Sequence, residues 1–417
     1  MPSIGISDFK SNVDLGCWTG AADLSLYRYL RDNMDFVELL TGIVKRFKIS
    51  DIFLQTGWPI LIGLHGKLTA VSHQLKESVI ENIIEWITRK QSVIGILMQG
   101  HDYDDAFSVE DPSLKDSDGC AIKHRFRVNI TGVNSEGKLG YQIAMRYIKS
   151  EPPTIEDVGL EKEIVENLDC GMGSIIFTGS TGSGKTSSIA AAIRYVMEGN
   201  TSITGNIITY EWPIEYTFDK IHSSCCVIAQ TEISRHLQNF AEGVRNSLRR
   251  KPALIMIGEL RDSDTISSAV EAANNGHPIF TTTHANGVCL TFKRLLEKFP
   301  ANQQKQALYS ILATTNMIVA QHIVPTTKFS KERPDYTCLR EWLFLDNDIR
   351  NRIEAVGLER HEEVIRSILD NPSSKSARSM LSSVKIKWKE GIISSDTAFS
   401  VLRNYGIREV NEDILRC

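Results

Sequence analysis

The chain has 417 residues, of which 42% are hydrophobic and 24% are charged, and its formal net charge is −4. This length allows two or three domains with buried cores, and the composition is ordinary for a globular protein. Because the charge is balanced, no bulk basic field favours nucleic acid, and we expect no direct nucleic-acid partner. The eight cysteines form no CxxC pair, and no apolar run reaches the roughly 18–20 residues that span a bilayer. We therefore expect a cytoplasmic protein with reduced thiols and no transmembrane segment.

The first part of the chain, residues 1–148, is predicted to be an α+β domain. Residues 51–55 and 60–64 are predicted to form a pair of strands. Apolar residues between 79 and 87 then recur at the spacing of one helix face.

Basic and apolar residues alternate in a later strand of this domain. Between residues 122 and 130, the alternation places Lys123, Arg125 and Arg127 on one face and apolar side chains on the other. Residues 141–148 alternate in the same way and present Arg146, and the glycine-containing segment 131–140 predicts a hairpin between the two strands. Because exposed ion pairs stabilise a fold by only about 0–1 kcal/mol, these cations favour a role outside their own domain. A solvated polar face is the alternative.

A linker and a second domain follow. Residues 149–160 are predicted to be the linker, because Pro152-Pro153 fits neither a helix interior nor a central strand. Residues 161–325 then alternate apolar strands with helical segments, which is typical of a mostly parallel sheet covered on both faces. The predicted strands are 175–178, 207–210, 254–258 and 279–283. Residues 326–417 are charged and predicted to be mainly helical.

Residues 179–186 read Gly-Ser-Thr-Gly-Ser-Gly-Lys-Thr, which is a complete GxxxxGKT phosphate loop. An apolar strand precedes the loop and a helical pattern from Ile189 to Met197 follows it, so backbone N–H groups and a helix N-terminus can hold phosphates together. The predicted nucleotide-binding residues are Gly179, Ser180, Thr181, Gly182, Ser183, Gly184, Lys185 and Thr186. Lys185 is predicted to contact the β- and γ-phosphates of ATP, and Thr186 to bind Mg²⁺.

Acidic residues follow two of the predicted strands. Glu259 ends the strand 254–258, where phosphate-loop ATPases place an acid that orients water or holds Mg²⁺ through water. Glu211 and Glu215 flank Pro213 beyond another strand, and either one is placed to activate water. The alternatives are an exposed glutamate at a strand end and a solvated loop.

Two histidines bracket the last predicted strand of the core. His284 follows a threonine-rich segment and is placed to sense the γ-phosphate by hydrogen bonding, whereas His277 lies at the opposite edge of the sheet. The sequence has no HExxH motif and no paired Cys/His spacing, so we expect no zinc site.

In this order, the motifs resemble those of the secretion-superfamily ATPases of the PilT/VirB11/GspE group. Residues 179–186 resemble the Walker A motif, 211–215 the Asp box, 254–262 the Walker B motif and 276–284 the His box. Residues 50–57 and 124–129 resemble the signatures of the family's N-terminal domain. Residues 233–252 look specifically like the DotB/TraJ branch, whose members serve type IVB secretion and related conjugation systems. The resemblance covers roughly residues 45–400.

The resemblance implies a homohexameric ring that hydrolyses ATP with Mg²⁺. It implies a RecA-like P-loop ATPase core, an N-terminal α+β domain that is PAS-like, and a helical C-terminal region. The N-terminal domain of one subunit would close over nucleotide held by its neighbour, so that Arg125, Arg127 or Arg146 stabilises charge on the γ-phosphate. The chain departs from the family at Trp212, where an aspartate is usual, which moves that role to Glu211 and Glu215.

These observations predict a cytoplasmic ATPase that powers a type IVB (Dot/Icm-like) or conjugative type IV secretion system. Its expected partners are further copies of itself and membrane-associated machine components at the inner membrane. A pilus retraction motor of the same fold is the nearest alternative. A nucleic-acid motor would need a basic, aromatic-rich channel, and an ATP-gated scaffold without turnover would have the same motifs. Residues 1–30 and 350–417 match the family poorly.

Overall fold

In the computed structural model, the described residues are 33–46, 49, 51–64, 67–115, 119–148, 151–329, 335–371, 374–407 and 410–416. The poorly matched residues 1–30, Ser50 of the first N-terminal signature and residues 149–150 of the predicted linker lie outside them. The chain divides into two compact units, Met1–Ser150 and Glu151–Cys417.

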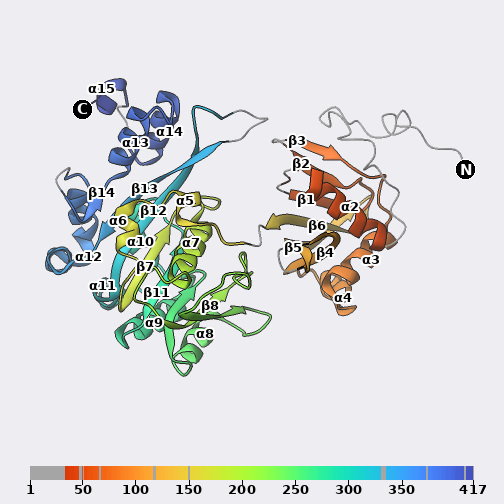
Figure 1. Cartoon of the computed structure of the whole chain (residues 1–417), viewed down its shortest axis with the longest axis horizontal. Helices are drawn as coiled ribbons and strands as arrows, with labels where there is room; N and C mark the ends of the chain where they lie inside the picture. The colour runs from red at the N-terminus through yellow and green to blue at the C-terminus, as the bar shows by residue number, and fades with distance from the viewer. Residues whose placement is uncertain are drawn as a thin grey trace, which may run out of the picture. The chain divides into compact units, whose positions relative to one another are not determined.

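The first unit contains a six-stranded antiparallel sheet with the order β3-β2-β1-β6-β5-β4 (Figure 1). Its strands are β1 (Asp51–Gln55), β2 (Leu61–Leu64), β3 (Lys67–Ala70), β4 (Tyr103–Lys115), β5 (Ala121–Ser135) and β6 (Lys138–Ile148). Its helices are α2 (Asn33–Arg46), α3 (Glu77–Thr88) and α4 (Ser92–Met98). The predicted pair of β1 with β2 is confirmed, and the predicted apolar face of α3 is buried.

The hairpin between β5 and β6 is much tighter than the sequence suggested. The predicted hairpin is confirmed, but its turn is shorter than the segment 131–140, because the two strands remain paired up to Ser135 opposite Lys138. Only Glu136 and Gly137 form the turn, both with positive φ, as a two-residue hairpin requires. Gly140 lies inside β6 instead, where an added Cβ would come within 2.8 Å of the Ser135 side chain. Close approach of two chain segments, and not a turn, explains this glycine.

The second unit contains an eight-stranded sheet with the order β14-β13-β12-β7-β11-β10-β8-β9. Its strands are β7 (Gly173–Thr178), β8 (Gly205–Glu211), β9 (Cys226–Glu232), β10 (Pro252–Ile257), β11 (Pro278–Thr283), β12 (Thr315–Pro325), β13 (Tyr336–Phe344) and β14 (Ala377–Arg378). The strands from β7 to β12 pair in parallel, and β13 and β14 are antiparallel additions. The mostly parallel sheet is as predicted, and the four predicted strands correspond to β7, β8, β10 and β11. The other four strands were not predicted from the sequence.

Helices cover both faces of this sheet (Figure 1). One face packs on α5 (Ile155–Val158), α6 (Lys162–Glu166) and α7 (Lys185–Met197). The other packs on α8 (Phe240–Ser247), α9 (Ser263–Asn274), α10 (Val288–Leu296), α11 (Gln304–Thr314) and α12 (Asn347–Leu369). A smaller core joins β12 and β13 to α13 (Met380–Lys389), α14 (Ser395–Asn404) and α15 (Glu412–Arg416).

Two adjacent buried charges on β13 tie these layers together. Arg340 donates to the carbonyl oxygens of Val158 and Gly159, each at 2.7 Å, and therefore anchors the segment that precedes the core. Glu341 accepts hydrogen bonds from the backbone N–H groups of Val288, at 2.7 Å, and Met380, at 3.1 Å. Successive residues of a strand point to opposite faces, so Arg340 and Glu341 reach different layers. Through them, β13 connects residues 158–159 on one face with the N-termini of α10 and α13 on the other.

We expect Glu341→Ala to destabilise the second unit strongly. The substitution would leave two buried backbone N–H groups without an acceptor, at a cost of about 3 kcal/mol in the free energy of unfolding. The matched control is Asp346→Ala, which removes an exposed carboxylate that caps α12 at the N–H of Ile349 and should cost about 1 kcal/mol. Urea-induced unfolding of the full chain measures both. Equal losses would show that Glu341 acts only as an ordinary helix cap.

Candidate functional site

The phosphate loop lies between the carboxyl end of β7 and the start of α7. Gly179, Gly182 and Gly184 all have positive φ, and Gly184 is the residue that precedes the first turn of α7. An added Cβ on Gly179 would lie 2.4 Å from the backbone oxygen of Gln321 and 2.6 Å from the Ser183 hydroxyl. Position 179 therefore requires glycine both for its conformation and for its packing.

Gln321 on β12 holds the phosphate loop against the sheet. Its role was not predicted from the sequence. Its side-chain amide donates to the carbonyl oxygen of Ser183 at 2.7 Å, and the residue is buried. The available signal was that Gln321 follows the apolar run 317–320 of β12, because a buried amide needs a partner. The contact fixes the loop on the sheet before any ligand binds.

Lys185 is buried, and its side chain is folded back onto its own loop. Its Nζ donates to the carbonyl oxygens of Gly179 at 2.9 Å and Ser180 at 3.0 Å. Burial lowers the pKa of Lys185, while the negative charges of Glu259 and Glu215 act in the opposite direction. The ammonium group therefore lies within the field of both acids, and phosphate oxygens can replace the carbonyl partners.

His284 and Glu259 complete a cluster at the carboxyl edge of the sheet. The Nδ1 of His284 lies 3.4 Å from the Lys185 Nζ, and its Nε2 lies 3.7 Å from the Oε1 of Glu259. Burial lowers the pKa of His284, and the charge of Lys185 lowers it further, so the imidazole is neutral at neutral pH. The imidazole ring therefore lies between the ammonium group of Lys185 and the carboxylate of Glu259.

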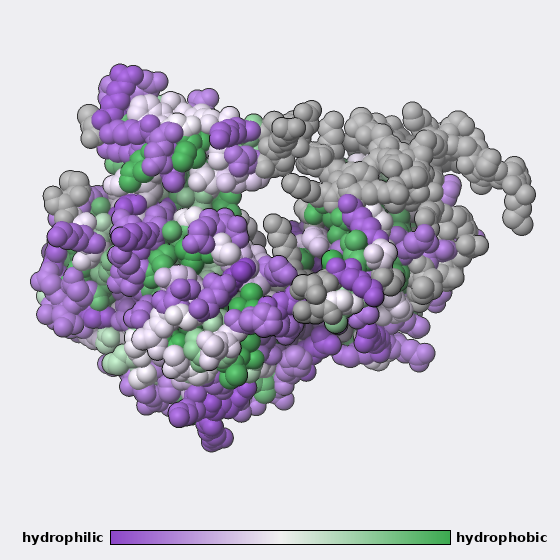
Figure 2. Space-filling model, viewed as in Figure 1, coloured by the Kyte–Doolittle hydropathy of each residue, from purple (hydrophilic) through white to green (hydrophobic). Residues whose placement is uncertain are grey.

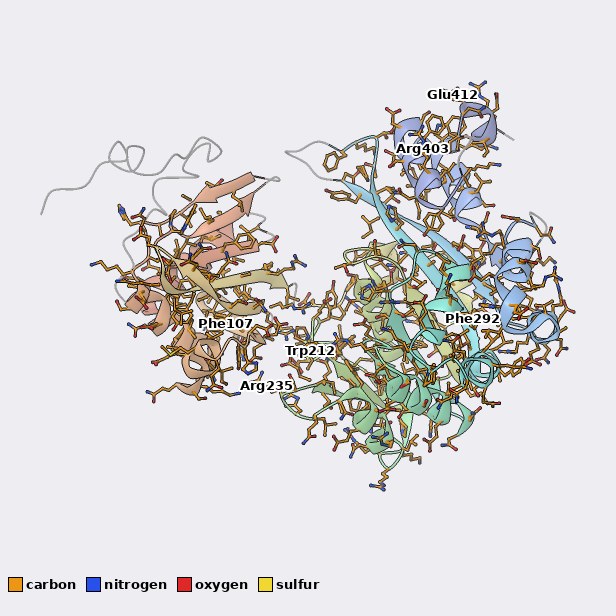
Figure 3. All side chains as sticks on the ribbon, turned by 180° about the vertical axis from the view of Figure 1, so that it is seen from behind. Phe107, Trp212, Arg235, Phe292, Arg403 and Glu412 are labelled. Atoms are coloured by element: carbon orange, nitrogen blue, oxygen red, sulfur yellow. The ribbon has the colours of Figure 1, made fainter. Side chains whose placement is uncertain are left out.

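A second cation holds the other oxygen of Glu259. The Nε of Arg261 donates to the Oε2 of Glu259 at 2.8 Å. The guanidinium carbon of Arg261 lies 4.3 Å from the ring centre of Trp212, on the loop that follows β8 (Figure 3). The sequence analysis identified Trp212 only as a departure from the family pattern and did not consider Arg261.

The two acids of the segment 211–215 have different surroundings. Glu211 is the last residue of β8, is buried, and accepts hydrogen bonds from Thr209 Oγ1 at 2.6 Å and Gln230 Nε2 at 3.1 Å. Glu215 is near enough to Lys185 to influence its pKa. Glu211 thus joins a polar network between β8 and β9. The charge of Glu215 instead acts on Lys185 of the phosphate loop.

The donor set around the loop suits Mg²⁺. Thr186 is partly buried at the start of α7, and the acids near Lys185 supply further oxygen ligands, which this ion prefers. Across the described parts of the chain, no group of three or more His, Cys, Asp or Glu residues is arranged to hold a metal alone. Such a partial set fits an ion that takes most of its ligands from water and nucleotide phosphates.

The predicted arginines belong to the first unit, whereas the phosphate loop belongs to the second. Arg127 and Arg146 lie directly opposite each other on β5 and β6, and Arg125 lies two residues before Arg127. Arg127 pairs with Asp104 at 3.8 Å, and Arg146 pairs with Asp51 at 2.9 Å. The side chains of Arg127 and Arg146 are 41% and 66% exposed, so these ion pairs are weak.

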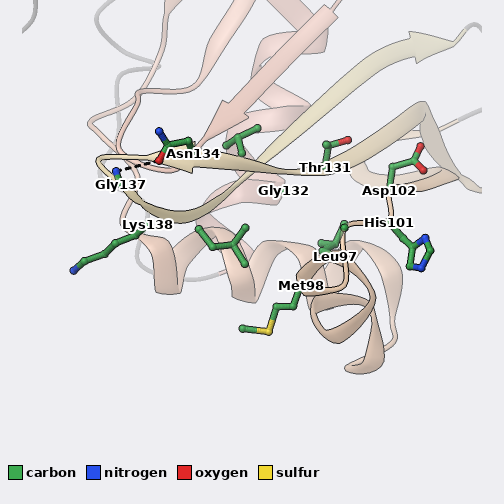
Figure 4. Close-up of a pocket in the computed structure, with 12 residues that line it drawn as sticks. Leu97, Met98, His101, Asp102, Thr131, Gly132, Asn134, Gly137 and Lys138 are labelled. Carbon is green, nitrogen blue, oxygen red and sulfur yellow. Dashed lines mark hydrogen bonds between the residues drawn. The ribbon is translucent and has the colours of Figure 1, made fainter.

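A hollow of about 480 Å³ also lies in the first unit, between α4 and the β5–β6 hairpin (Figure 4). Its lining includes Leu97, Met98, Leu139, His101 and Asp102. The hollow shares no residue with the phosphate loop, so it is separate from the candidate nucleotide site.

Comparisons with known proteins identify the family and the relatives of the chain. Residues 122–376 match the family described as type II/IV secretion system protein. The structure is similar to the ATPase DotB of Legionella pneumophila, with 33% identity, a TM-score of 0.77, and coverage of 91% of this chain and 98% of that one. It is also similar to the pilus retraction motor PilT with bound ADP, at 26% identity and a TM-score of 0.70 over 88% of this chain and 96% of that one. The type IV pilus ATPase PilU of Pseudomonas aeruginosa is 31% identical over 70% of this chain and 71% of its own.

We expect Lys185→Ala to weaken ATP binding roughly 30- to 150-fold, because it removes a charge-assisted contact worth about 2–3 kcal/mol. Glu259→Gln should bind ATP with an affinity within about twofold of that of the unchanged chain, because the amide keeps the shape of the carboxylate. Glu259 also lies beside the phosphate loop and is not part of it. Titration of the protein with a fluorescent ATP analogue measures both affinities. Equal affinity of the Lys185→Ala protein and the unchanged protein would contradict the assignment of the loop.

Proposed function

The chain belongs to the type II/IV secretion system protein family, with the α/β fold of its ATPases, and on that premise we propose that it is a Mg²⁺-dependent ATPase. We propose further that it powers a type IVB (Dot/Icm-like) or conjugative type IV secretion system. The observation that carries the proposal is the convergence of Lys185, His284 and Glu259 beside a complete phosphate loop. Three different strands deliver these side chains to the same edge of one sheet.

In the proposed mechanism, the chain positions the phosphates and orients the water. The loop N–H groups and Lys185 bind the β- and γ-phosphates, and Thr186 contributes a hydroxyl ligand to Mg²⁺. Glu259 accepts a proton from the attacking water or orients it, and His284, beside Lys185 and Glu259, senses the γ-phosphate by hydrogen bonding. Glu215 is the better second acid, because its charge acts on Lys185, whereas Glu211 is buried at the end of β8.

We propose that the arginines of the first unit act on nucleotide bound by another subunit of a homohexameric ring. Their ion pairs with Asp104 and Asp51 are largely exposed and so contribute only about 0–1 kcal/mol each. A γ-phosphate that develops negative charge in a dry site would attract the same guanidinium groups much more strongly. Exchange of a weak carboxylate partner for phosphate therefore costs little.

The protein is proposed to work in the cytoplasm and to reach the inner membrane through partner proteins of the secretion machine. Among the described residues, no helix is long and apolar enough to cross a membrane. On the face that Figure 2 shows, hydrophobic residues form small patches between hydrophilic ones. We therefore propose that a complex with partner proteins, and not a segment embedded in lipid, recruits the chain to the inner membrane.

A pilus retraction motor is the second candidate, which the likeness to PilU and PilT supports. The likeness to DotB favours secretion, because it covers more of the chain at higher identity. Deletion of the gene in its own bacterium separates the two functions. We expect loss of translocation of a reporter-tagged secreted substrate and unchanged twitching, with rescue by the natural gene but not by Lys185→Ala. Loss of twitching alone would favour the pilus motor.

We expect Glu259→Gln to lower the rate of ATP hydrolysis by a factor of about 10² or more, because an amide cannot accept the proton of the attacking water. Glu215→Gln should lower the rate by a similar factor, and Glu211→Gln by less, since Glu211 belongs to the strand network. Phosphate release in the presence of Mg²⁺ measures all three. Full turnover by the Glu259→Gln protein would remove this residue from the catalytic role.

We expect Arg127→Ala to bind ATP normally and to hydrolyse it poorly, since a guanidinium group at the γ-phosphate contributes roughly 10³-fold in phosphoryl transfer. Mixing this variant with Lys185→Ala should restore part of the activity, because some interfaces then combine an intact loop with an intact arginine. Arg125→Ala and Arg146→Ala, mixed in the same way, identify which arginine acts. No recovery at any ratio, in rings shown to exchange subunits, would leave at most a role within one chain.

A further inference from the structure

Arg261 is held on three sides by residues that are distant in the sequence. It lies two residues after Glu259, on the loop that follows β10, and its Nε donates to the Oε2 of Glu259 at 2.8 Å. The ring of Trp212, from the loop after β8, lies 4.3 Å from its guanidinium carbon. The ring of Phe240, the first residue of α8, lies 5.5 Å from the same carbon.

The aromatic contacts restrict a side chain that would otherwise be free to move. Both partners of the Arg261–Glu259 pair are partly exposed, at 34% and 26%, and exposed pairs between long side chains are weak and poorly oriented. A guanidinium group stacked on an aromatic face is attracted to the ring and keeps fewer rotamers. The ring of Trp212 therefore gives the ion pair a defined direction.

The direction of this ion pair sets the direction of Glu259. Because Arg261 holds Oε2, Oε1 is left on the side of His284, whose Nε2 is 3.7 Å away. His284 in turn lies 3.4 Å from the ammonium group of Lys185. One oxygen of the carboxylate is thus held by the protein, and the other faces the phosphate loop.

The chemistry of a tryptophan at position 212 suits this task better than an acid would. An aspartate there would accept hydrogen bonds from the edge of the Arg261 guanidinium and would compete with Glu259 for the same N–H donors. An aromatic ring contacts the flat face of the guanidinium and leaves its edge donors available. Tryptophan in place of aspartate at position 212 therefore leaves the N–H donors of Arg261 available to bind Glu259.

We propose that Trp212 and Arg261 are positioning residues, which hold the carboxylate of Glu259 with one oxygen directed toward the γ-phosphate; this inference rests on the proposed ATP hydrolysis. Neither residue needs to touch the nucleotide. Their contribution lies in the turnover number, because binding depends on the loop, Lys185 and Gln321.

Steady-state ATP hydrolysis and ATP affinity of full-length variants test the proposal. Arg261→Ala should lower kcat about 10- to 100-fold, and Trp212→Ala about 3- to 5-fold, with ATP affinity within about twofold of the unchanged protein. Trp212→Phe keeps an aromatic face and should restore kcat to within about twofold. The double variant Trp212→Ala/Arg261→Ala should be no slower than Arg261→Ala alone, because the tryptophan acts only through the arginine.

Arg378→Ala provides a matched control. Arg378 stacks on Trp342, with its guanidinium carbon 4.1 Å from the ring centre, and donates to Glu163 at 2.5 Å, so it forms the same kind of cluster on another part of the second unit. Its loss should leave kcat unchanged, with thermal melting showing that each variant is folded.

Several results would overturn the proposal. Normal kcat in Trp212→Ala, or full additivity in the double variant, would show that the stacking does not orient Glu259. A loss of ATP affinity in Arg261→Ala as large as its loss of kcat would place Arg261 on the nucleotide itself. Failure of the unchanged protein to hydrolyse ATP would instead contradict the proposed function.

Discussion

The burial of the Lys185 ammonium group is the constraint on which the site depends. A cation cannot lie in the interior of an α/β core without acceptors, and here the carbonyl oxygens of Gly179 and Ser180 supply them. These acceptors exist only because the loop turns tightly, and the turn is fixed from below by Gln321. In the proposed function, nucleotide would meet a charge that is already in place and would supply phosphate oxygens in exchange for the backbone carbonyls.

The same principle explains how distant segments are joined to this core. Arg340 and Glu341 are both buried on β13, and both bind backbone groups. Arg340 also pairs with the carboxylate of Glu161 at 3.1 Å. Arg340 binds the segment that enters the core domain, and Glu341 binds the N-termini of two helices. Burial raises the pKa of Glu341, while its two N–H donors act in the opposite direction. Loss of either residue would leave several polar groups unpaired, which makes this strand a structural link between the beginning and the end of the second unit.

The sequence predicted what depends on local pattern and missed what depends on contacts between distant residues. The parallel strands, the phosphate loop with its helix, and the alternation that exposes Arg125 and Arg127 all follow from spacing within about ten residues. The support from Gln321, the stacking of Arg261 on Trp212 and the network around Glu211 each require strands that are far apart in the chain. Gly140 was misassigned for the same reason, since it marks a close approach of chain segments and not the turn that it suggested. The roles of the site residues remain predictions, because geometry places them together without showing turnover.

Charge balance within the second unit gives a physical reason for arginines supplied from elsewhere. Lys185 faces the loop, but the negative charges of Glu259 and Glu215 also act on its ammonium group. Arg261 is engaged by Glu259 and by two aromatic rings, and His284 is neutral. Among the described residues, Lys185 is thus a cation that the fold places directly on the phosphate loop. In the proposed hydrolysis, an additional guanidinium group would stabilise the charge on the γ-phosphate in the transition state. The cationic face of β5 and β6 carries guanidinium groups in weak ion pairs, and an assembly that delivers them to this loop would couple hydrolysis to the association of subunits.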